Sequence, residues 1–593
     1  MDGRFLAVGA RRLWVRGVTY GPFAPGADGE RFPGDGRVRD DFAAMAAAGV
    51  NAVRTYTAPP RRVLDAARDA GLWVMAGLPW EQHVAFLDER GRAAAIETRV
   101  REAVRGCAGH PALLLHAIGN EVPSGIVRWH GRRRVERFLD RLCAAVREED
   151  PGALVSYVNF PSTEHLRVPA ADVAAFNVYL EDGDRLAAYL ARLHNLAGDR
   201  PLLLAEAGLD SRRNGRSAQA RAVADQVGTA FATGCAGTFV FAWTDEWHRG
   251  DDEVADWDFG LVDRERRAKP ALAAVAGAYA AVPPRTLDLP ATTVVVCTHN
   301  GAATLRECLE HVLALDHPAF DVVVVDDGST DASAALAAEL GVRVISTPNR
   351  GLSAARNTGL AAATGEVVAY LDDDAFPDPD WLTFLGTAFR ATGHAAVGGP
   401  NLPPADETGF AACVARAPGG PVHVLLSDTE AEHLPGCNMA FRRAALEAVG
   451  GFDPQFRVAG DDVDVCWKLQ AAGATLGFHP AAVVWHRRRA TLRRFWRQQR
   501  GYGRAEALLE RKWPEKYNLP GHVTWAGRLY GPGTGALVRR SRVYHGTFGA
   551  AAFQPEVERP AGPLAGLTAT PEWYLLLAAL AAVTAMGPLW APL

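Results

Sequence analysis

Three consecutive carboxylates, Asp372, Asp373 and Asp374, follow an apolar run at residues 367 to 371 that reads as a buried strand. Like charges at a strand end repel one another, so such a cluster is either solvated surface or the site of a cation. Oxygen ligands suit Mn²⁺ or Mg²⁺, which completes its shell with water and substrate phosphates. The triplet therefore predicts a divalent cation that holds a diphosphate.

Two glutamates in the first half also end apolar runs, Glu121 in "AIGNEVP" and Glu206 in "LLAEAG". Paired carboxyl groups of this kind cleave glycosidic bonds when one carries a proton and the other is ionised. Glu121 would be the acid, with a pKa raised by burial or by its partner's charge, and Glu206 would stay ionised. A separation of about 5 to 5.5 Å would indicate retention of configuration, and a wider one inversion.

Eight apolar runs, separated mostly by helical stretches, position these glutamates. They are "LWVRGVTY", "NAVRTY", "GLWVMAGL", "ALLLHAIGNE", "ALVSYVNF", "DVAAFNVYL", "PLLLAEAG" and "GTFVFAW". This alternation over about 240 residues predicts a (β/α)₈ barrel, in which chemistry collects at the carboxyl ends of the strands. Glu121 would follow the fourth strand and Glu206 would end the seventh.

From residue 292 the pattern changes to β-branched runs that are each followed by polar residues and a helix. They are "TTVVVCTHNG", "FDVVVVDDGSTD", "GVRVISTPNRG" and "GEVVAYLDDDAFPD". The pattern predicts an open, mostly parallel α/β sheet, in which ligands bind beyond the carboxyl ends of the strands. The acidic triplet lies at one of those ends.

Composition sets further limits. A formal net charge of −5 argues against wholesale nucleic-acid binding, and no nucleic-acid partner is expected. Eight cysteines without a CxxC pair indicate small core residues in a reducing compartment. The N-terminus lacks a signal-peptide h-region. Residues 573 to 593 are uncharged and form a candidate transmembrane segment, with a buried helix as the alternative.

The first half resembles clan A glycoside hydrolases over nearly all of residues 10 to 280. Asn120 and Glu121 look like the acid/base motif of that clan, and Glu206 looks like its nucleophile. The resemblance extends to three positions that in the clan orient the nucleophile or floor the sugar site. These are Arg54, Tyr179 and Trp243.

The second half, about 290 to 515, resembles family 2 glycosyltransferases of the GT-A fold. The resemblance implies that Asp326 or Asp327 accepts from the nucleotide's base or ribose, and that Arg356 and Asn357 lie near the sugar-diphosphate. In "LDDDA" it places Asp372 toward the donor sugar or ribose, Asp374 on the metal and Asp373 between them. It also implies His486 as a further metal ligand, which completes a set of Asp374, Asp372 and His486.

The same resemblance assigns the base that deprotonates the acceptor hydroxyl to an acidic pair at a helix start. Here the pair is Asp461 and Asp462, and its first member departs from the family's usual Glu. Asp462 is therefore the expected base, with Asp461 as the alternative. An inverting displacement needs one base and no covalent nucleophile.

Residues 487 to 513 hold ten basic residues and two acids, with aromatic residues between them. Two readings are open: an interfacial helix beside anionic lipid, or arginines, Arg500 and Arg504, that guard the diphosphate.

We expect five parts: a glycoside-hydrolase-like TIM barrel (1–283), a linker (284–291), a GT-A domain (292–520), an extension (521–570) and a possible transmembrane segment (571–593). The whole would transfer sugar from a nucleotide-sugar to a glycan or lipid-linked acceptor with inversion, beside a retaining glycosidase or transglycosidase barrel. We expect it at the cytoplasmic face of the inner membrane. Two alternatives remain, a non-catalytic glycan-binding barrel and a truncated processive polysaccharide synthase.

Overall fold

The computed structural model describes residues 1–26, 29–283, 288–417, 420–519, 521–527 and 571–586. The chain divides into two compact units, the first ending at Arg285 and the second beginning at Thr286. Each unit is described by itself.

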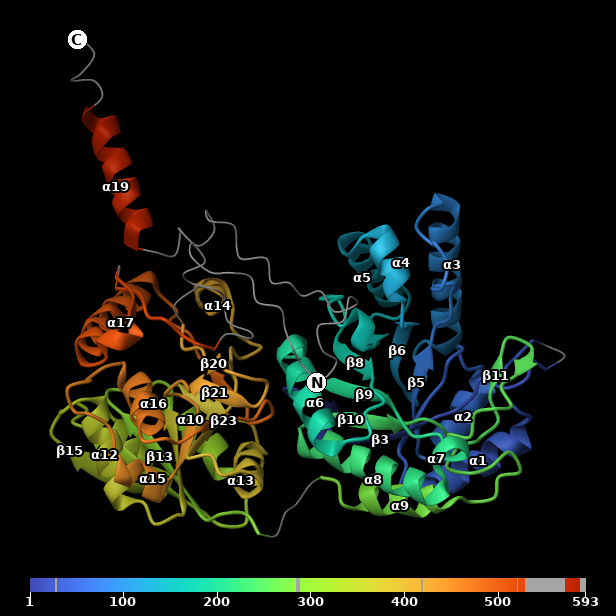
Figure 1. The fold of residues 1–593 in the computed structure, drawn as a ribbon, viewed down its shortest axis with the longest axis horizontal. Helices are drawn as coiled ribbons and strands as arrows, with labels where there is room; N and C mark the ends of the chain where they lie inside the picture. The colour runs from blue at the N-terminus through green and yellow to red at the C-terminus, as the bar shows by residue number, and fades with distance from the viewer. Residues whose placement is uncertain (27–28, 284–287, 418–419, 520, 528–570, 587–593) are drawn as a thin grey trace. The chain divides into compact units, whose positions relative to one another are not determined.

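The first unit is a closed barrel of eight parallel strands, which confirms the predicted (β/α)₈ architecture (Figure 1). Its strands are β3 (Val15–Thr19), β4 (Ala52–Arg54), β5 (Trp73–Gly77), β6 (Leu113–Asn120), β7 (Val155–Asn159), β8 (Val173–Asn177), β9 (Leu202–Ala207) and β10 (Gly237–Val240). Each pairs with its neighbour in sequence, and β10 closes the ring on β3. These strands are buried on both faces, as expected where helices cover a parallel barrel.

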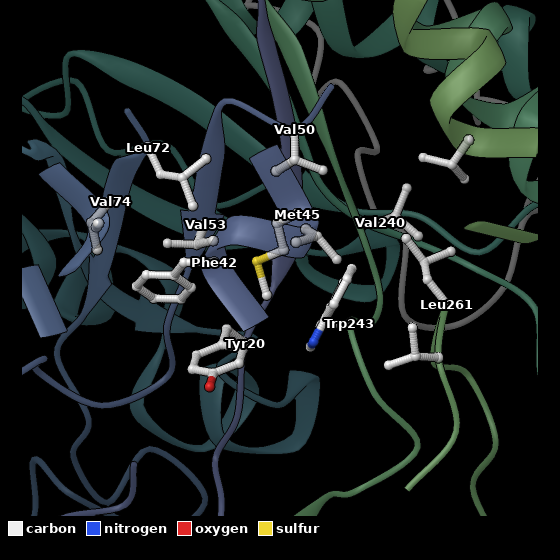
Figure 2. Close-up of a cluster of buried hydrophobic side chains, with 14 of the residues drawn as sticks. Tyr20, Phe42, Met45, Val50, Val53, Leu72, Val74, Val240, Trp243 and Leu261 are labelled. Carbon is white, nitrogen blue, oxygen red and sulfur yellow. The ribbon is translucent and has the colours of Figure 1, made fainter. Parts of the chain in front are cut away.

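Helices follow the strands around the barrel. They include α1 (Asp35–Ala47), α2 (Arg61–Asp69), α3 (Arg90–Cys107), α4 (Ser124–His130), α5 (Arg132–Glu149), α6 (Gly183–Ala197), α8 (Arg216–Ala232) and α9 (Pro270–Ala280). A large hydrophobic cluster fills the space between strands and helices. Figure 2 shows Phe42 and Met45 of α1 gathered with Tyr20, Val53 and Trp243 in this cluster.

The second unit is built on a nine-stranded mixed sheet in the order β15-β14-β13-β16-β22-β18-β23-β21-β20. The four strands predicted from β-branched runs are parallel: β13 (Thr292–Thr298), β14 (Phe320–Asp327), β15 (Arg343–Thr347) and β16 (Val367–Asp372). Beyond them β22 (Met439–Arg442) runs antiparallel to β16, so the sheet is mixed rather than mostly parallel. The remaining strands are β18 (Ala396–Gly398), β23 (Leu476–Phe478), β21 (Glu430–His433) and β20 (Val424–Leu425).

The helices of this unit pack on the sheet or border its carboxyl edge. They are α10 (Leu305–Leu313), α11 (Ser333–Glu339), α12 (Leu352–Ala362), α13 (Trp381–Ala391), α14 (Gly409–Arg416), α15 (Arg443–Ala448), α16 (Asp461–Ala471) and α17 (Leu492–Lys512). A separate small sheet joins β17 (Ala375–Pro377), β24 (Val484–His486) and β19 (Asn401–Leu402). Its register pairs Ala375 with His486, which carries the end of β24 to the acidic triplet.

The last described element is α19 (Pro571–Met586), a helix of 16 residues. Within the described ranges, none of the helices combines the length and the apolar character that a bilayer crossing requires. Most of the predicted extension, residues 528–570, and the end of the predicted transmembrane segment, residues 587–593, lie outside the described part of the chain.

Two candidate active sites

The first candidate site centres on Glu206, which is buried near the end of β9. Arg54 Nη1 and the Tyr56 hydroxyl each donate to its Oε1 at 2.8 Å, and the Tyr179 hydroxyl donates to its Oε2 at 2.7 Å. One cation and two hydroxyl donors therefore fix both oxygens and stabilise the ionised carboxylate.

Glu121 directly follows β6 and has a φ of 54°, in the left-handed region that few non-glycine residues adopt. Asn177 Nδ2 donates to its Oε1 at 2.8 Å. Burial, and next the negative charge of Glu206, raise the pKa of Glu121 to about 7. Glu206 is thus paired directly with a cation, whereas the neighbouring Glu121 has a raised pKa.

Asparagine side chains connect the two glutamates through Arg54. Asn120 Oδ1 accepts from Arg54 Nη2 at 2.7 Å and from Asn177 Nδ2 at 3.0 Å, so Asn120 positions both groups. Tyr56 and Asn177 were not anticipated from the sequence. Each lies two residues from a predicted site residue, Arg54 or Tyr179, and the period of two along extended chain is the signal that could have found them.

The prediction for Trp243 is wrong. This side chain is only 1% exposed and packs in the hydrophobic cluster behind the strands, where it cannot floor a sugar site (Figure 2). Phe241 lies in the corresponding place, with its ring centroid 4.8 Å from Trp247 and 6.1 Å from Tyr179. Tyr179 itself is 42% exposed, although its hydroxyl is tied to Glu206, so its ring is open to a ligand. Alternation along a continuing strand would place Phe241 and Trp243 on the same side, but β10 ends at Val240, so the strand pattern does not extend to Trp243.

The second candidate site contains the acidic triplet. Asp372, Asp374 and His486 each offer a ligand atom, and these atoms lie within 4.8 Å of one another. His486 Nε2 is 3.1 Å from Asp374 Oδ1, as the pairing of β17 with β24 requires. Two carboxylates and an imidazole at this spacing fit a divalent cation such as Mn²⁺ or Mg²⁺.

Positively charged side chains of the protein also contact the acidic cluster. Arg489 Nη1 donates to Asp374 Oδ2 at 2.6 Å. Although burial opposes ionisation, His486 and Arg489 hold the pKa of Asp374 below its usual range. The cluster therefore attracts positive charge, which supports its fit to a metal ion.

Asp373 takes no part in this cluster. The Thr298 hydroxyl donates to its Oδ2 at 2.6 Å, and the carboxylate packs so closely on Gly301 that a Cβ there would lie 1.9 Å from Oδ2. Burial, followed by the charge of Asp374, raises the pKa of Asp373 to about 7. Successive side chains in extended chain point in opposite directions, which is why Asp372 and Asp374 converge and Asp373 holds the end of β13.

A cavity of about 980 Å³ joins these residues to the acidic pair at the start of α16. Arg356, itself 2% exposed, donates to Asp372 Oδ1 at 3.1 Å and also to Asp461 Oδ2. Burial and the charge of Asp462 nevertheless raise the pKa of Asp461 to about 6. Arg356 thus links the metal cluster to the acidic pair.

Asp462 is the more accessible member of the pair, with its side chain 20% exposed against 2% for Asp461. Its carboxylate accepts from the backbone N–H groups of Gly436 and Val463, each at 2.9 Å. Burial raises the pKa of Asp462, but His433, Arg356 and the Gly436 N–H stabilise the anion. Their combined effect lowers the pKa of Asp462 to about 2. The structure therefore presents an ionised Asp462 to the cavity.

Two other predicted residues, Asp326 and Asp327, lie outside the cavity lining. Asp327 accepts from the N–H groups of Arg350 and Gly351, both at 2.8 Å, and Asp326 accepts from the Ser329 N–H at 3.0 Å. These two carboxylates therefore bind backbone N–H groups of the loops that lead into α11 and α12.

The prediction for Asn357 is wrong, because both ends of its amide bond the backbone of Phe452. His299 lines the cavity instead and was missed, since it sits in a loop whose path depends on the fold.

Arg500 and Arg504 do not guard the cavity either. Both are exposed on the outer face of α17, whereas Arg489, Arg494, Arg497 and Tyr502 line the cavity. Arg489 precedes α17, and within the helix the sequence alone does not say which residues turn toward the cavity.

Comparison with known families agrees with this division. The family model "Glycosyl hydrolases family 2, TIM barrel domain" matches residues 2–282, and "Glycosyl transferase family 2" matches residues 293–450. The resemblances predicted for the two halves are thereby confirmed. A solved structure, the GH2 β-galacturonidase from Eisenbergiella tayi bound to galacturonate, is 18% identical and covers 47% of this chain and 53% of its own, with a TM-score of 0.42.

Two relatives match the second unit. The pre-mycofactocin glycosyltransferase of Mycobacterium tuberculosis H37Rv is 34% identical over 236 residues, which are 38% of this chain and 48% of that protein. The glucosyl-dolichyl phosphate glucuronosyltransferase of Haloferax volcanii is 28% identical over 220 residues, 33% of this chain and 68% of that protein. The chain thus spans about half the length of the first relative.

The origin of the Glu121 pKa is testable. In the Glu206→Gln variant the neighbouring negative charge is removed, so the titration midpoint of Glu121 should fall from about 7 toward the value set by burial alone. Carboxyl ¹³C chemical shifts followed against pH measure this midpoint. An unchanged midpoint would show that the two glutamates do not interact.

Proposed function

We propose that this chain, which joins a barrel of the glycosyl hydrolase family 2 type to a domain of the glycosyl transferase family 2 type, acts on carbohydrate at two sites. The second unit transfers a sugar from a nucleotide-sugar to a glycan or lipid-linked acceptor with inversion. The barrel hydrolyses or transglycosylates a glycoside with retention. Both units handle the same class of compound, which makes their fusion chemically coherent.

The transferase proposal rests on one observation: the acidic pair lines the same cavity as Asp372 and His486, and Asp374 lies beside these two residues. These three residues would hold a Mn²⁺ or Mg²⁺ ion, which supplies positive charge for a leaving diphosphate. Asp462 takes the proton of the acceptor hydroxyl as its oxygen attacks the anomeric carbon, and the nucleoside diphosphate departs from the opposite side. Asp461 is less suited to this role because Arg356 and burial enclose it.

The nature of the acceptor is supported by the relatives. One of them is named as acting on glucosyl-dolichyl phosphate, a lipid-linked sugar, and a comparable acceptor would suit this chain. Eight free cysteines support a reducing compartment such as the cytoplasmic side of a membrane.

The barrel proposal rests on the three donors that fix Glu206 beside a protonated Glu121. Glu206 attacks the anomeric carbon and forms a glycosyl ester, while Glu121 gives its proton to the leaving oxygen. Glu121 then takes a proton from water, or from an acceptor hydroxyl, which displaces Glu206 and restores both groups. Two displacements retain the configuration.

Loss of the nucleophile should stop the barrel reaction. We expect Glu206→Gln to lower kcat/KM on an active aryl glycoside by at least about a thousandfold, or about 4 kcal/mol of activation free energy. The matched variant Glu253→Gln, in an exposed loop of the same barrel, should keep full activity.

Wild-type hydrolysis should also decline as pH rises through about 7, because Glu121 then loses its proton. Undiminished turnover by Glu206→Gln would remove this assignment, and binding without turnover by the wild type would favour a glycan-binding barrel.

Loss of a metal ligand should stop the transferase reaction. With Mn²⁺ present, Asp374→Asn should lower nucleotide-sugar hydrolysis by on the order of a hundredfold or more, and EDTA should do the same to the wild type. Asp321→Asn is the matched control, because Asp321 lies at the start of β14, at the opposite edge of the sheet. Activity that survives both Asp374→Asn and chelation would contradict the metal role.

A further inference from the structure

The outer face of α17 carries apolar side chains where a soluble helix would carry polar ones. Leu492 is 67% exposed and Trp496 is 64% exposed, and they lie one helical turn apart on the same side. Phe410 of α14 is 38% exposed, and its ring centroid lies 6.4 Å from that of Phe495, so α14 extends the patch. Contiguous exposed apolar side chains of this size mark an interaction surface.

Arginines surround this patch and lack partners. Arg493, Arg497 and Arg500 are exposed, and within the described residues none of them forms an ion pair. The first turn of α17 holds no acidic residue, although the helix dipole there favours anions and disfavours arginine. A negatively charged surface on a binding partner would neutralise these arginines.

We propose that these six residues form a docking face that binds a bilayer surface containing anionic phospholipid. The docking face comprises Phe410, Leu492, Arg493, Trp496, Arg497 and Arg500. Its indole and aliphatic groups enter the headgroup region, and its guanidinium groups bind lipid phosphates, as amphipathic interfacial helices do. Charge complementarity selects anionic lipid, because three exposed cations on an apolar patch would be repelled by a basic partner, and Arg494 of the same turn adds a fourth.

The docking face adjoins the cavity of the second unit. Arg494 and Arg497 belong to the same helical turns and also line the cavity that holds Asp462 and the metal cluster. The docking face is therefore continuous with the cavity rim, and binding would bring the rim to the lipid surface. A sugar acceptor attached to lipid could then enter without leaving the bilayer.

A second basic and aromatic patch, on the barrel, is a rival. Trp129 of α4 is 70% exposed, with Arg132 and Arg134 of α5 nearby in sequence. Its groups are already partnered, because Trp129 Nε1 donates to Asp88, Arg132 pairs with Glu136 and Arg134 bonds the Leu87 carbonyl. This patch therefore supplies matched control variants.

The test is sedimentation of the full chain with vesicles of phosphatidylcholine, with and without phosphatidylglycerol. We expect binding only to the anionic vesicles, and weaker binding as salt is raised. Leu492→Ser with Trp496→Ser should lower the binding constant at least about tenfold. Arg493→Gln with Arg500→Gln should lower it about thirtyfold, from about 1 kcal/mol per arginine. Circular dichroism should show all variants folded.

The controls change the same residue types on the barrel: Trp129→Ser, and Arg133→Gln with Arg137→Gln, two exposed arginines one turn apart on α5 beside the partnered Arg132 and Arg134. They should leave vesicle binding unchanged. Absence of binding by the wild type, equal binding to neutral vesicles, equal losses in the controls, or full binding by the docking-face variants would each overturn the proposal. Because vesicle binding is measured without turnover, it stands or falls separately from the proposed chemistry.

Discussion

A carboxylate removed from water must receive either a cation or a proton, and both candidate sites are built on this requirement. In the barrel, Arg54 contacts Glu206 and leaves Glu121 to keep its proton. In the second unit, Arg356 lies between Asp372 and Asp461, while Asp462 is stabilised by His433 and backbone N–H groups. In the second unit the pKa values of Asp461 and Asp462 are thus pushed apart, and in the barrel the pKa of Glu121 is raised, which is the condition for assigning acid and base roles.

In both units these groups lie at the carboxyl ends of parallel strands. Glu121 follows β6, Glu206 lies near the end of β9 and Arg54 ends β4, so the barrel converges them at one mouth. In the mixed sheet, β13 and β16 end side by side, and the hydroxyl of Thr298 meets Asp373 there. Chain segments far apart in sequence supply the rest, since β24 brings His486 and the loop after β24 brings Arg489.

Much of this could be predicted because it depends on local patterns. The β-branched runs fix the parallel strands, and acids at their ends must lie at a shared edge. Glu121, Glu206, Asp372 and Asp374 therefore appear where sequence reasoning places them. The antiparallel half of the second sheet was harder to predict, because its short strands β18, β21 and β23 carry weak periodic signals.

The misplaced residues share one cause, which is that sequence does not say toward which side a residue faces. Trp243 turns into the core and Phe241 takes the mouth, although both follow the same strand. Asn357 lies next to Arg356 on α12 but faces Phe452. Arg500 and Arg504 lie on the outer face of α17, and Arg489, three residues after His486, reaches the metal cluster instead. Tertiary packing decides each case.

The central claim is that the Asp372, Asp374 and His486 cluster binds a divalent cation, for which Arg489 competes through its bond to Asp374 Oδ2. Binding of Mn²⁺ to the full chain, followed by electron paramagnetic resonance, tests this directly. Arg489→Gln should bind Mn²⁺ about tenfold more tightly than the wild type, on the scale of one charge-assisted hydrogen bond. Arg487→Gln, which loses pairs to Glu307 and Asp406 and a contact with the Phe376 ring, should bind as the wild type does. Equal affinities for Arg489→Gln, Asp374→Asn and the wild type would contradict the account.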